Sequence, residues 1–244
     1  GQVMLKKILK EKSLKAKAIF GLFPANSVGD DIEVYDQEKT KTLAKFLTLR
    51  QQLKKKEGEP NIALSDFIAP KDSEIEDYIG CFCVSTGFGS DELSKAYEDK
   101  IDDYSSIMVK AIADRLAEAY AEYLHKEIRT NKWGYVRNED LDNKELIKES
   151  YKGIRPAPGY PACPDHLEKE TIWKLLDVEK AIGVKLTESL AMWPASSVSG
   201  YYFANEKSKY FGLGNINEDQ LKDYAKRKNI DLEKARKWLS PNLN

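Results

Sequence analysis

A change in hydrophobic spacing at Ser90 is the feature that most constrains the fold of this chain. Downstream of it, apolar residues recur at intervals of three and four positions, which is the period of a helix with one buried face. The pattern predicts one long amphipathic helix from near Asp102 to Ile128. The residues that define it are Ile107, Met108, Ile112, Leu116, Ala119, Tyr120 and Tyr123.

Upstream of Ser90 the apolar runs are short and rich in branched, aromatic and sulfur-containing residues, as in strands. Residues 15–36 carry two such runs, broken by Pro24 and by Gly29-Asp30-Asp31, and predict a pair of strands around a turn-rich loop. Residues 61–70 and 77–87 are further strand candidates. Most of the predicted sheet therefore lies in the first third of the chain.

Short helices and strands are predicted to follow the long helix. The helices cover residues 143–152, ended by Gly153, and 169–183, closed by Gly183. Two C-terminal helices begin at Asn217, where Gln220 completes a capping-box pattern, and at Asp231. The strand-like stretches are residues 186–193, 199–205 and 208–216.

These elements predict an α+β fold in which a mainly antiparallel, twisted sheet is crossed by one long central helix and flanked by others. No repeat of fixed period and no low-complexity linker divides the chain. We therefore expect residues 1–244 to form a single domain.

The charge balance and the lengths of the apolar runs exclude two classes of partner. The 244 residues carry 39 Lys+Arg and 40 Asp+Glu, a net charge of -1, so no overall field favours nucleic acid. The longest apolar stretches, such as "YIGCFCV", are far too short to span a bilayer, and no secretory signal is recognisable. A cytoplasmic protein with no nucleic-acid or membrane partner is expected.

The three cysteines predict reduced thiols rather than a disulfide framework. Cys81 and Cys83 alternate on one face of a predicted strand. Cys163 and His166 are close in sequence, but such neighbours rarely form a catalytic pair. His125 and His166 are the only histidines, and neither has partners at a convincing metal-ligand spacing. We expect no metal and no catalytic residue.

Two other patterns are interpreted as structural. Gly87-x-Gly89 lies between a predicted strand and helix, but acidic residues occupy the helix start, where a bound phosphate would meet like charge. Glu118 and Glu122 share a helix face, which usually means solvated surface. Composition and spacing alone thus indicate an α+β binding domain or enzyme.

The segment "RPAPGYPACPDH", residues 155–166, is unusual because prolines alternate with glycine, tyrosine and cysteine rather than with linker residues. Proline fixes the backbone, and glycine permits a close approach to a ligand. The segment therefore predicts a preorganised edge, or else a rigid connector over the core.

Several long stretches, in the same order along nearly the whole chain, resemble the C-terminal activation domain of cobalamin-dependent methionine synthase. They are "LFPANSVGDDIEVY", "SDFIAPK", "DYIGCF", "MVKAIADRLAEAYAEYLH", "RPAPGYPACPDH", "EKETIWKLLDVEKAIGVKLTESLAMWP", "SVSGYYF" and "SKYF". The family's D-x-H-x-x-G cobalt-ligand motif is absent. The resemblance therefore implies a fragment of a larger synthase, or a stand-alone relative, that does not hold cobalamin itself.

In that family the activation domain binds S-adenosylmethionine and docks on the cobalamin-binding section. A flavodoxin-type donor reduces the oxidised cofactor, and S-adenosylmethionine methylates it back to methylcobalamin. The resemblance implies the same ligand and the same two partners here. It also implies that the isolated chain is not catalytic, although it belongs to an enzyme.

The resemblance also implies a set of site residues. Arg155 suits the ligand carboxylate, Asp66 its ammonium, and the backbone at Ala157 and Gly159 its adenine. Tyr160 matches a residue that faces the cobalamin. The remaining matches are Tyr210 and Phe211 of "SKYF", of which Phe211 lacks the hydroxyl common in the family, and the acidic residues Glu118 and Glu149.

A self-contained S-adenosylmethionine-dependent methyltransferase with its own acceptor is the alternative. Against it, the chain lacks the glycine-rich loop after a first strand, with an acidic residue some twenty positions later, that is usual for Rossmann-type enzymes using this donor.

Overall fold

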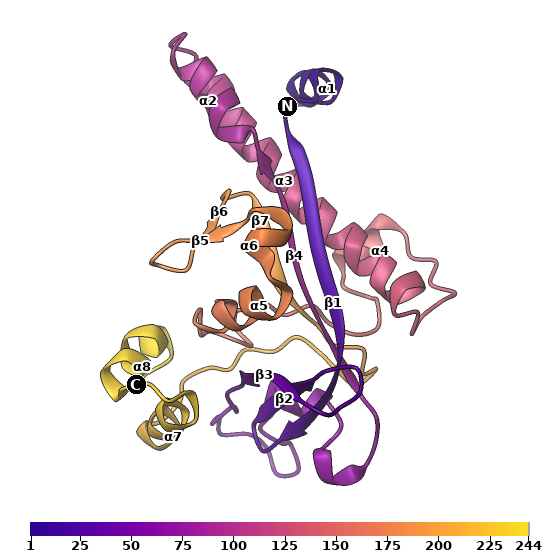
Figure 1. Cartoon of the computed structure of the whole chain (residues 1–244), viewed down its shortest axis with the longest axis vertical. Coiled ribbons are helices and arrows are strands. Elements are labelled where there is room, and N and C mark those ends of the chain that lie inside the picture. Colours follow the sequence, from indigo (N-terminus) through magenta and orange to yellow (C-terminus); the bar gives the residue numbers. More distant parts are fainter. Residues whose placement is uncertain (244) are drawn as a thin grey trace.

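The computed structural model describes residues 1–243 and confirms the predicted α+β fold (Figure 1). Its main sheet has the strand order β3-β2-β1-β4-β7, and every neighbouring pair is antiparallel. The strands are β1 (Lys15–Val28), β2 (Asp31–Tyr35), β3 (Thr42–Leu47), β4 (Tyr78–Phe88) and β7 (Ser197–Tyr202). A separate two-stranded sheet contains β5 (Lys185–Leu186) and β6 (Met192–Trp193).

The predicted break at Pro24 is wrong, because β1 continues through this residue as one strand of 14 residues. Pro24 is the last residue of β1 in register with β4, and Ala25 is the first in register with β2. The strand thus changes partner at Pro24, where the missing N–H is tolerated. The turn at Gly29 and Asp30 between β1 and β2 is as predicted.

Residues 61–70 do not form the predicted strand. They contain a 3-10 turn, η1 (Leu64–Phe67), in which the Asp66 carboxylate accepts a hydrogen bond of 2.9 Å from the Ala63 N–H. This local bond offers the backbone an alternative to a sheet ladder, which is a common effect of aspartate. A short 3-10 turn, η2 (Lys71–Ser73), follows.

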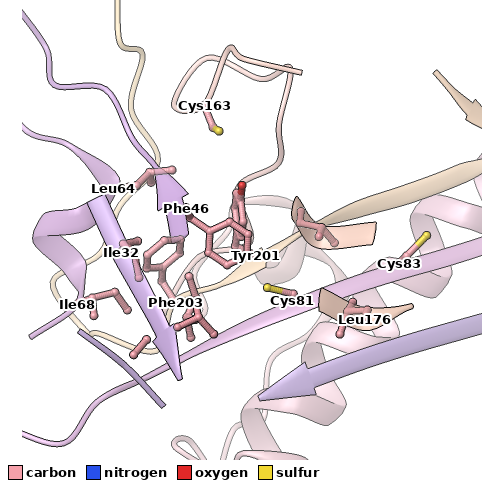
Figure 2. Packing of buried hydrophobic residues seen from close by; sticks show 14 of the residues in the cluster. Ile32, Phe46, Leu64, Ile68, Cys81, Cys83, Cys163, Leu176, Tyr201 and Phe203 are labelled. Carbon is pink, nitrogen blue, oxygen red and sulfur yellow. The ribbon is translucent and has the colours of Figure 1, made fainter. Parts of the chain in front are cut away.

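The two faces of β4 are covered by different helices, as its alternating side chains require. Cys81 and Cys83 lie in the larger core, with α5 (Glu168–Leu176) and α6 (Val178–Ile182). Figure 2 shows Cys81 beside Tyr201, with Cys83 farther away; the rings of Tyr201 and Phe46 meet edge to face at 4.9 Å. Phe82 instead faces the long helix. All three cysteines are free, as predicted, and all three are buried.

The predicted long helix is confirmed as α3 (Asp103–Glu127), with Asp102 as its N-cap. The Asp102 side chain accepts a hydrogen bond of 3.0 Å from the Ser105 N–H. A π-helical turn, η3 (Ile128–Lys132), continues the helix beyond the predicted end. Figure 1 shows α3 running alongside β1 and β4, with α2 (Ser90–Glu98) leading into it. Gly89, with a φ of 93°, is the N-cap of α2, and Asp91 and Glu92 lie in its first turn, the tight turn that the structural interpretation predicts.

Several shorter elements differ from the sequence prediction. The helix predicted over 143–152 is only α4 (Asn143–Ile147), and the one over 169–183 is two helices separated by Asp177 in a left-handed conformation. Gly183 closes α6 as predicted. Residues 208–216 form no strand of the described sheets. They extend between β7 and the C-terminal helices.

The C-terminal helices begin as predicted, with Asn217 and Asp231 as N-caps of α7 (Glu218–Lys228) and α8 (Leu232–Leu239). The predicted capping box at Asn217 is not formed. Its partner Gln220 is buried and instead bonds both backbone groups of Arg50, with its oxygen 2.7 Å from the N–H and its nitrogen 2.8 Å from the C=O. Tertiary contacts therefore override the local motif. A 3-10 turn, η4 (Ser240–Asn242), ends the described chain.

The N-terminal helix α1 (Gln2–Glu11) lies at the end of β1 beside the upper part of α3 (Figure 1). Among residues 1–243 no helix combines the length and the apolar character that a membrane span needs.

Candidate functional site

The proline-rich segment is fixed to the edge of the sheet beside β7. Ile154 and Phe203 form an antiparallel bridge, and the Pro156 carbonyl accepts a hydrogen bond of 2.9 Å from the Tyr201 N–H. Gly200 makes this approach possible, because a Cβ there would lie 2.5 Å from the Pro156 oxygen. The Pro161 carbonyl in turn accepts from the Leu213 N–H at 2.8 Å. The segment thus joins β7 to residues 208–216.

A cavity of about 500 Å³ opens between this segment, α3 and residues 208–216, a volume typical of a small-molecule site. Its wall combines apolar side chains with two carboxylates and one guanidinium. The residues that line it are Phe82, Glu118, Glu149, Arg155, Pro156, Ala157, Tyr160, Pro161, Ala162, Val198, Ser199, Tyr210, Phe211 and Gly212. Most of the site residues implied by the resemblance are therefore brought together here.

Gly159 is not among the residues that line this cavity. It has a φ of 94°, and a Cβ there would meet the His166 ring at 2.2 Å. Its N–H donates to the Cys163 carbonyl at 2.7 Å. Its glycine character is explained by this tight turn rather than by the close approach to a ligand that we expected.

Asp66 also lies outside the lining of this cavity. Its two carboxylate oxygens accept hydrogen bonds of 2.7 Å from the two terminal nitrogens of Arg50. Burial opposes the charged form of Asp66, but the bonds from Arg50 and Ala63 and the charge of Arg50 outweigh it and lower its pKa. Phe67, the next residue, meets Phe211 of the cavity wall at 6.3 Å. The turn that carries Asp66 therefore adjoins the wall, while its carboxylate is paired elsewhere.

Arg155 is held at both its backbone and its side chain. Its N–H donates a hydrogen bond of 3.0 Å to the Tyr210 hydroxyl, which lies 3.0 Å from the Tyr151 hydroxyl. The Arg155 Nη1 donates to the Tyr151 hydroxyl at 3.3 Å. Two tyrosines thus connect the backbone of Arg155 to its own guanidinium.

The Nη1 of Arg155 has more acceptors than hydrogens. Besides Tyr151, it lies 2.9 Å from Glu122 Oε2 and 3.2 Å from His125 Nδ1. A guanidinium cannot accept, so His125 Nδ1 is the acceptor and a neutral ring carries its proton on Nε2. No hydrogen bond of Arg155 Nε or Nη2 is found within residues 1–243. The Nε–Nη2 edge is therefore the part of the guanidinium left for a ligand.

The reading of Glu122 as a solvated helix residue is wrong. Its side chain is 25% exposed, and its Oε1 is buried. His125, one turn further along α3, is fully buried, stacks on Tyr202 at 5.2 Å and meets Tyr151 edge to face at 4.9 Å. Burial, to which the charges of Arg129 and Arg155 add, lowers the pKa of His125 well below its usual range.

The cavity also has an acidic wall and an exposed rim. Glu118 and Glu149 are both exposed members of the lining. Glu149 adopts a φ of 55°, an uncommon conformation for a residue other than glycine, directly after α4. Tyr160 is 61% exposed. Phe211, in contrast, packs against the larger core.

The thiol and imidazole of "CPDH" do not form a reactive pair. Burial, with a contribution from Glu168 and Asp165, raises the pKa of the Cys163 thiol well above its usual range. His166 Nδ1 instead lies 3.0 Å from Lys169 Nζ. The described part of the chain holds no group of three or more His, Cys, Asp and Glu side chains arranged to bind a metal ion.

Comparison with known proteins identifies the family of the chain. A family model described as "Vitamin B12 dependent methionine synthase, activation domain" matches residues 1–229. The chain is also similar to a crystal structure titled as the MetH reactivation domain bound to AdoHcy. The two share 55% sequence identity with a TM-score of 0.97, over 100% of this chain and 75% of that one.

Proposed function

This chain belongs to the activation-domain family of vitamin B12-dependent methionine synthases, and from that premise we propose that it binds S-adenosylmethionine in the cavity beside Arg155. The bound methyl donor then serves to reactivate a cobalamin held by a separate section of the enzyme. The similar crystal structure, of a MetH reactivation domain bound to AdoHcy, supports a ligand of this class.

The observation that carries the proposal is the half-engaged guanidinium of Arg155. Its Nη1 contacts Glu122 and His125, whereas no hydrogen bond of its Nε–Nη2 edge is found within residues 1–243. Arg155 itself lines the cavity. Two parallel N–H donors match a carboxylate in a bidentate arrangement. The methionyl carboxylate of S-adenosylmethionine is such a group.

The rest of the wall fits the other parts of the ligand. The backbone of residues 156–162 is preorganised by prolines and offers a rigid edge for the adenine, which reduces the entropy lost on binding. Glu118 and Glu149 are formally anionic and suit the sulfonium and the ammonium. The Tyr210 ring can lie near the sulfonium. Asp66 stays a prediction of the resemblance, since its carboxylate is engaged by Arg50.

We propose Tyr160 as part of the surface that docks on the cobalamin section, because it is exposed at the rim of the cavity. Docking there would bring the donor methyl group to the cobalt by proximity. When held by that section and reduced by a flavodoxin-type donor, the cobalamin would supply the nucleophile for the methyl group, and S-adenosylhomocysteine would be left on this chain. A cytoplasmic setting is part of the same proposal.

Reconstitution with separate components tests this function. The chain is mixed with a cobalamin-binding section in its cobalt(II) state, a flavodoxin-type reductant and S-adenosylmethionine, and the absorbance of methylcobalamin is followed. Methylcobalamin is expected to form only when all four are present. Omitting this chain is the control for direct methylation of the cobalamin section.

Two results would contradict the proposal. One is equal methylation without the chain. The other is robust methyl transfer by the chain alone to a small acceptor, which would instead support a self-contained methyltransferase.

A further inference from the structure

On its Nη1 side Arg155 adjoins charged groups that are not among the residues lining the cavity. Glu122, His125 and Arg129 follow one another along the inward side of α3 and its π-helical turn, and Tyr151 packs against them. We propose that Glu122 is a positioning residue, which holds Nη1 of Arg155 so that the Nε–Nη2 edge meets the ligand carboxylate. This inference rests on the proposed function.

Arg129 is a second cation close to Arg155. Its Cζ lies 4.4 Å from the centroid of the Tyr151 ring, and the Arg155 Cζ lies 5.8 Å from the same centroid. Glu122 is near both guanidinium groups, with Oε2 2.9 Å from Arg155 Nη1 and Oε1 3.9 Å from Arg129 Nη1. It is therefore the carboxylate between two like charges.

The two arginines differ in how firmly they are held. Arg129 is fully buried, and its Nε and Nη2 donate bonds of 2.7 and 2.6 Å to the two Glu139 oxygens. The Arg155 side chain is 19% exposed and has a cavity beside it. If the charge of Glu122 were lost, repulsion between the cations would displace Arg155 rather than Arg129.

His125 and Tyr151 cannot replace Glu122. Both are neutral acceptors for Nη1, and the pKa of His125 is lowered by burial and by the charges of Arg129 and Arg155. Glu122 alone among these three acceptors carries a charge opposite to that of the guanidinium, so its ion pair at 2.9 Å gains a Coulombic attraction that the two neutral groups do not offer. Glu122 thus supplies the dominant interaction that orients Nη1.

Glu122→Gln tests the proposal, because it keeps the shape of the side chain and removes its charge. Calorimetry measures the binding of S-adenosylmethionine and of 5′-methylthioadenosine, which retains the nucleoside but has no carboxylate. We expect affinity for S-adenosylmethionine to fall about 5- to 30-fold, while that for 5′-methylthioadenosine changes less than about 2-fold. In an Arg155→Ala background, Glu122→Gln should have no further effect on S-adenosylmethionine binding.

Glu139→Gln is the matched control. It removes a buried carboxylate from the same cluster, but Glu139 bonds Arg129 and makes no bond to Arg155 in the described structure. It should lower the melting temperature but leave the ratio of the affinities for S-adenosylmethionine and 5′-methylthioadenosine unchanged. If Glu122→Gln does not fold, Tyr151→Phe removes another acceptor of Nη1, and a smaller loss with the same ligand selectivity is expected.

The outcomes separate this inference from the proposed function. Equal losses for both ligands, a loss that persists without Arg155, or unchanged or tighter S-adenosylmethionine binding would each overturn the role of Glu122 and leave the proposed function standing. An unmodified chain that binds no S-adenosylmethionine would overturn both.

Discussion

The backbone N–H of Arg155 donates a hydrogen bond of 3.0 Å to the hydroxyl of Tyr210, a residue 55 positions further along the chain. Through Tyr151, the same hydroxyl is linked to the side chain of Arg155. The proline-rich segment and the segment 208–216 are therefore joined at Arg155, the one cation among residues 1–243 that lines the cavity. This relationship makes Tyr210 a support for Arg155 as well as part of the wall.

Tyr210→Phe should weaken S-adenosylmethionine binding while leaving the fold intact. The variant keeps the aromatic ring and removes one hydroxyl, which is worth about 0.5 to 1.5 kcal/mol, or roughly 2- to 10-fold in dissociation constant. Calorimetry measures the effect, and the melting temperature is the control. An unchanged dissociation constant would show that the bond to Arg155 does not support the site.

Arg155→Ala should weaken S-adenosylmethionine binding by about 10- to 150-fold, because a charge-assisted contact worth roughly 1.5 to 3 kcal/mol is removed. Arg155→Lys should recover only part of this loss, since lysine lacks the planar fork. Because Glu122 loses its partner at 2.9 Å in the alanine variant, the melting temperature should also fall. Preserved affinity in the folded fraction would assign Arg155 a structural role alone.

Glu149→Gln and Glu118→Gln should reduce the preference for S-adenosylmethionine over S-adenosylhomocysteine. The methylated ligand carries one net positive charge, whereas its product is neutral overall, so an acidic wall favours the donor. Each exposed carboxylate should change the ratio of the two dissociation constants by about 2- to 5-fold. Competition binding with both ligands measures that ratio. A ratio that is the same in the parent chain and in both variants would contradict this role.

Acidification should destabilise the protein through His125. Burial, with Arg129 and Arg155, lowers its pKa in the folded state, so the unfolded chain binds more protons below about pH 6.5. The part of the free energy of unfolding that comes from keeping His125 neutral is fully present above that pH. It is lost as the pH falls. The loss should approach about 1.4 kcal/mol per pH unit.

The matched variant is His125→Asn, whose side-chain oxygen can still accept from Arg155 but does not titrate. Urea unfolding at pH 7, 6 and 5 should show a steeper fall for the parent chain than for the variant. Parallel slopes would mean that His125 is not the group responsible.

The sequence correctly predicted the elements whose residues keep a regular spacing, either that of a helix or that of a strand. The spacing of three and four predicted α3, and the alternation of Cys81 and Cys83 predicted a strand, β4, with both cysteines on one face. The errors occur where tertiary contacts outweigh local preference. Gln220 bonds the backbone of Arg50 instead of capping α7, and β1 passes Pro24 because it changes partner there.

The candidate site could be predicted only through resemblance. Arg155, Tyr160 and Tyr210 all line the cavity. Glu122 was misread because its spacing from Glu118 is also that of a solvated helix face. The sequence signal that could have identified it is its place four residues after Glu118 and three before His125, on a helix face that continues to Arg129. What buries that face is the chain around Tyr151, which no helical period reveals.

The central claim is that S-adenosylmethionine binds beside the free edge of Arg155, and a crystal structure of the chain with this ligand tests it most directly. We predict ligand density in the cavity lined by Glu149, Arg155 and Tyr210, with the methionyl carboxylate about 3 Å from Nε and Nη2 of Arg155. Density elsewhere, for example in the separate hollow lined by Asp66 and Lys71, or a ligand whose carboxylate makes no contact with Arg155, would contradict the account.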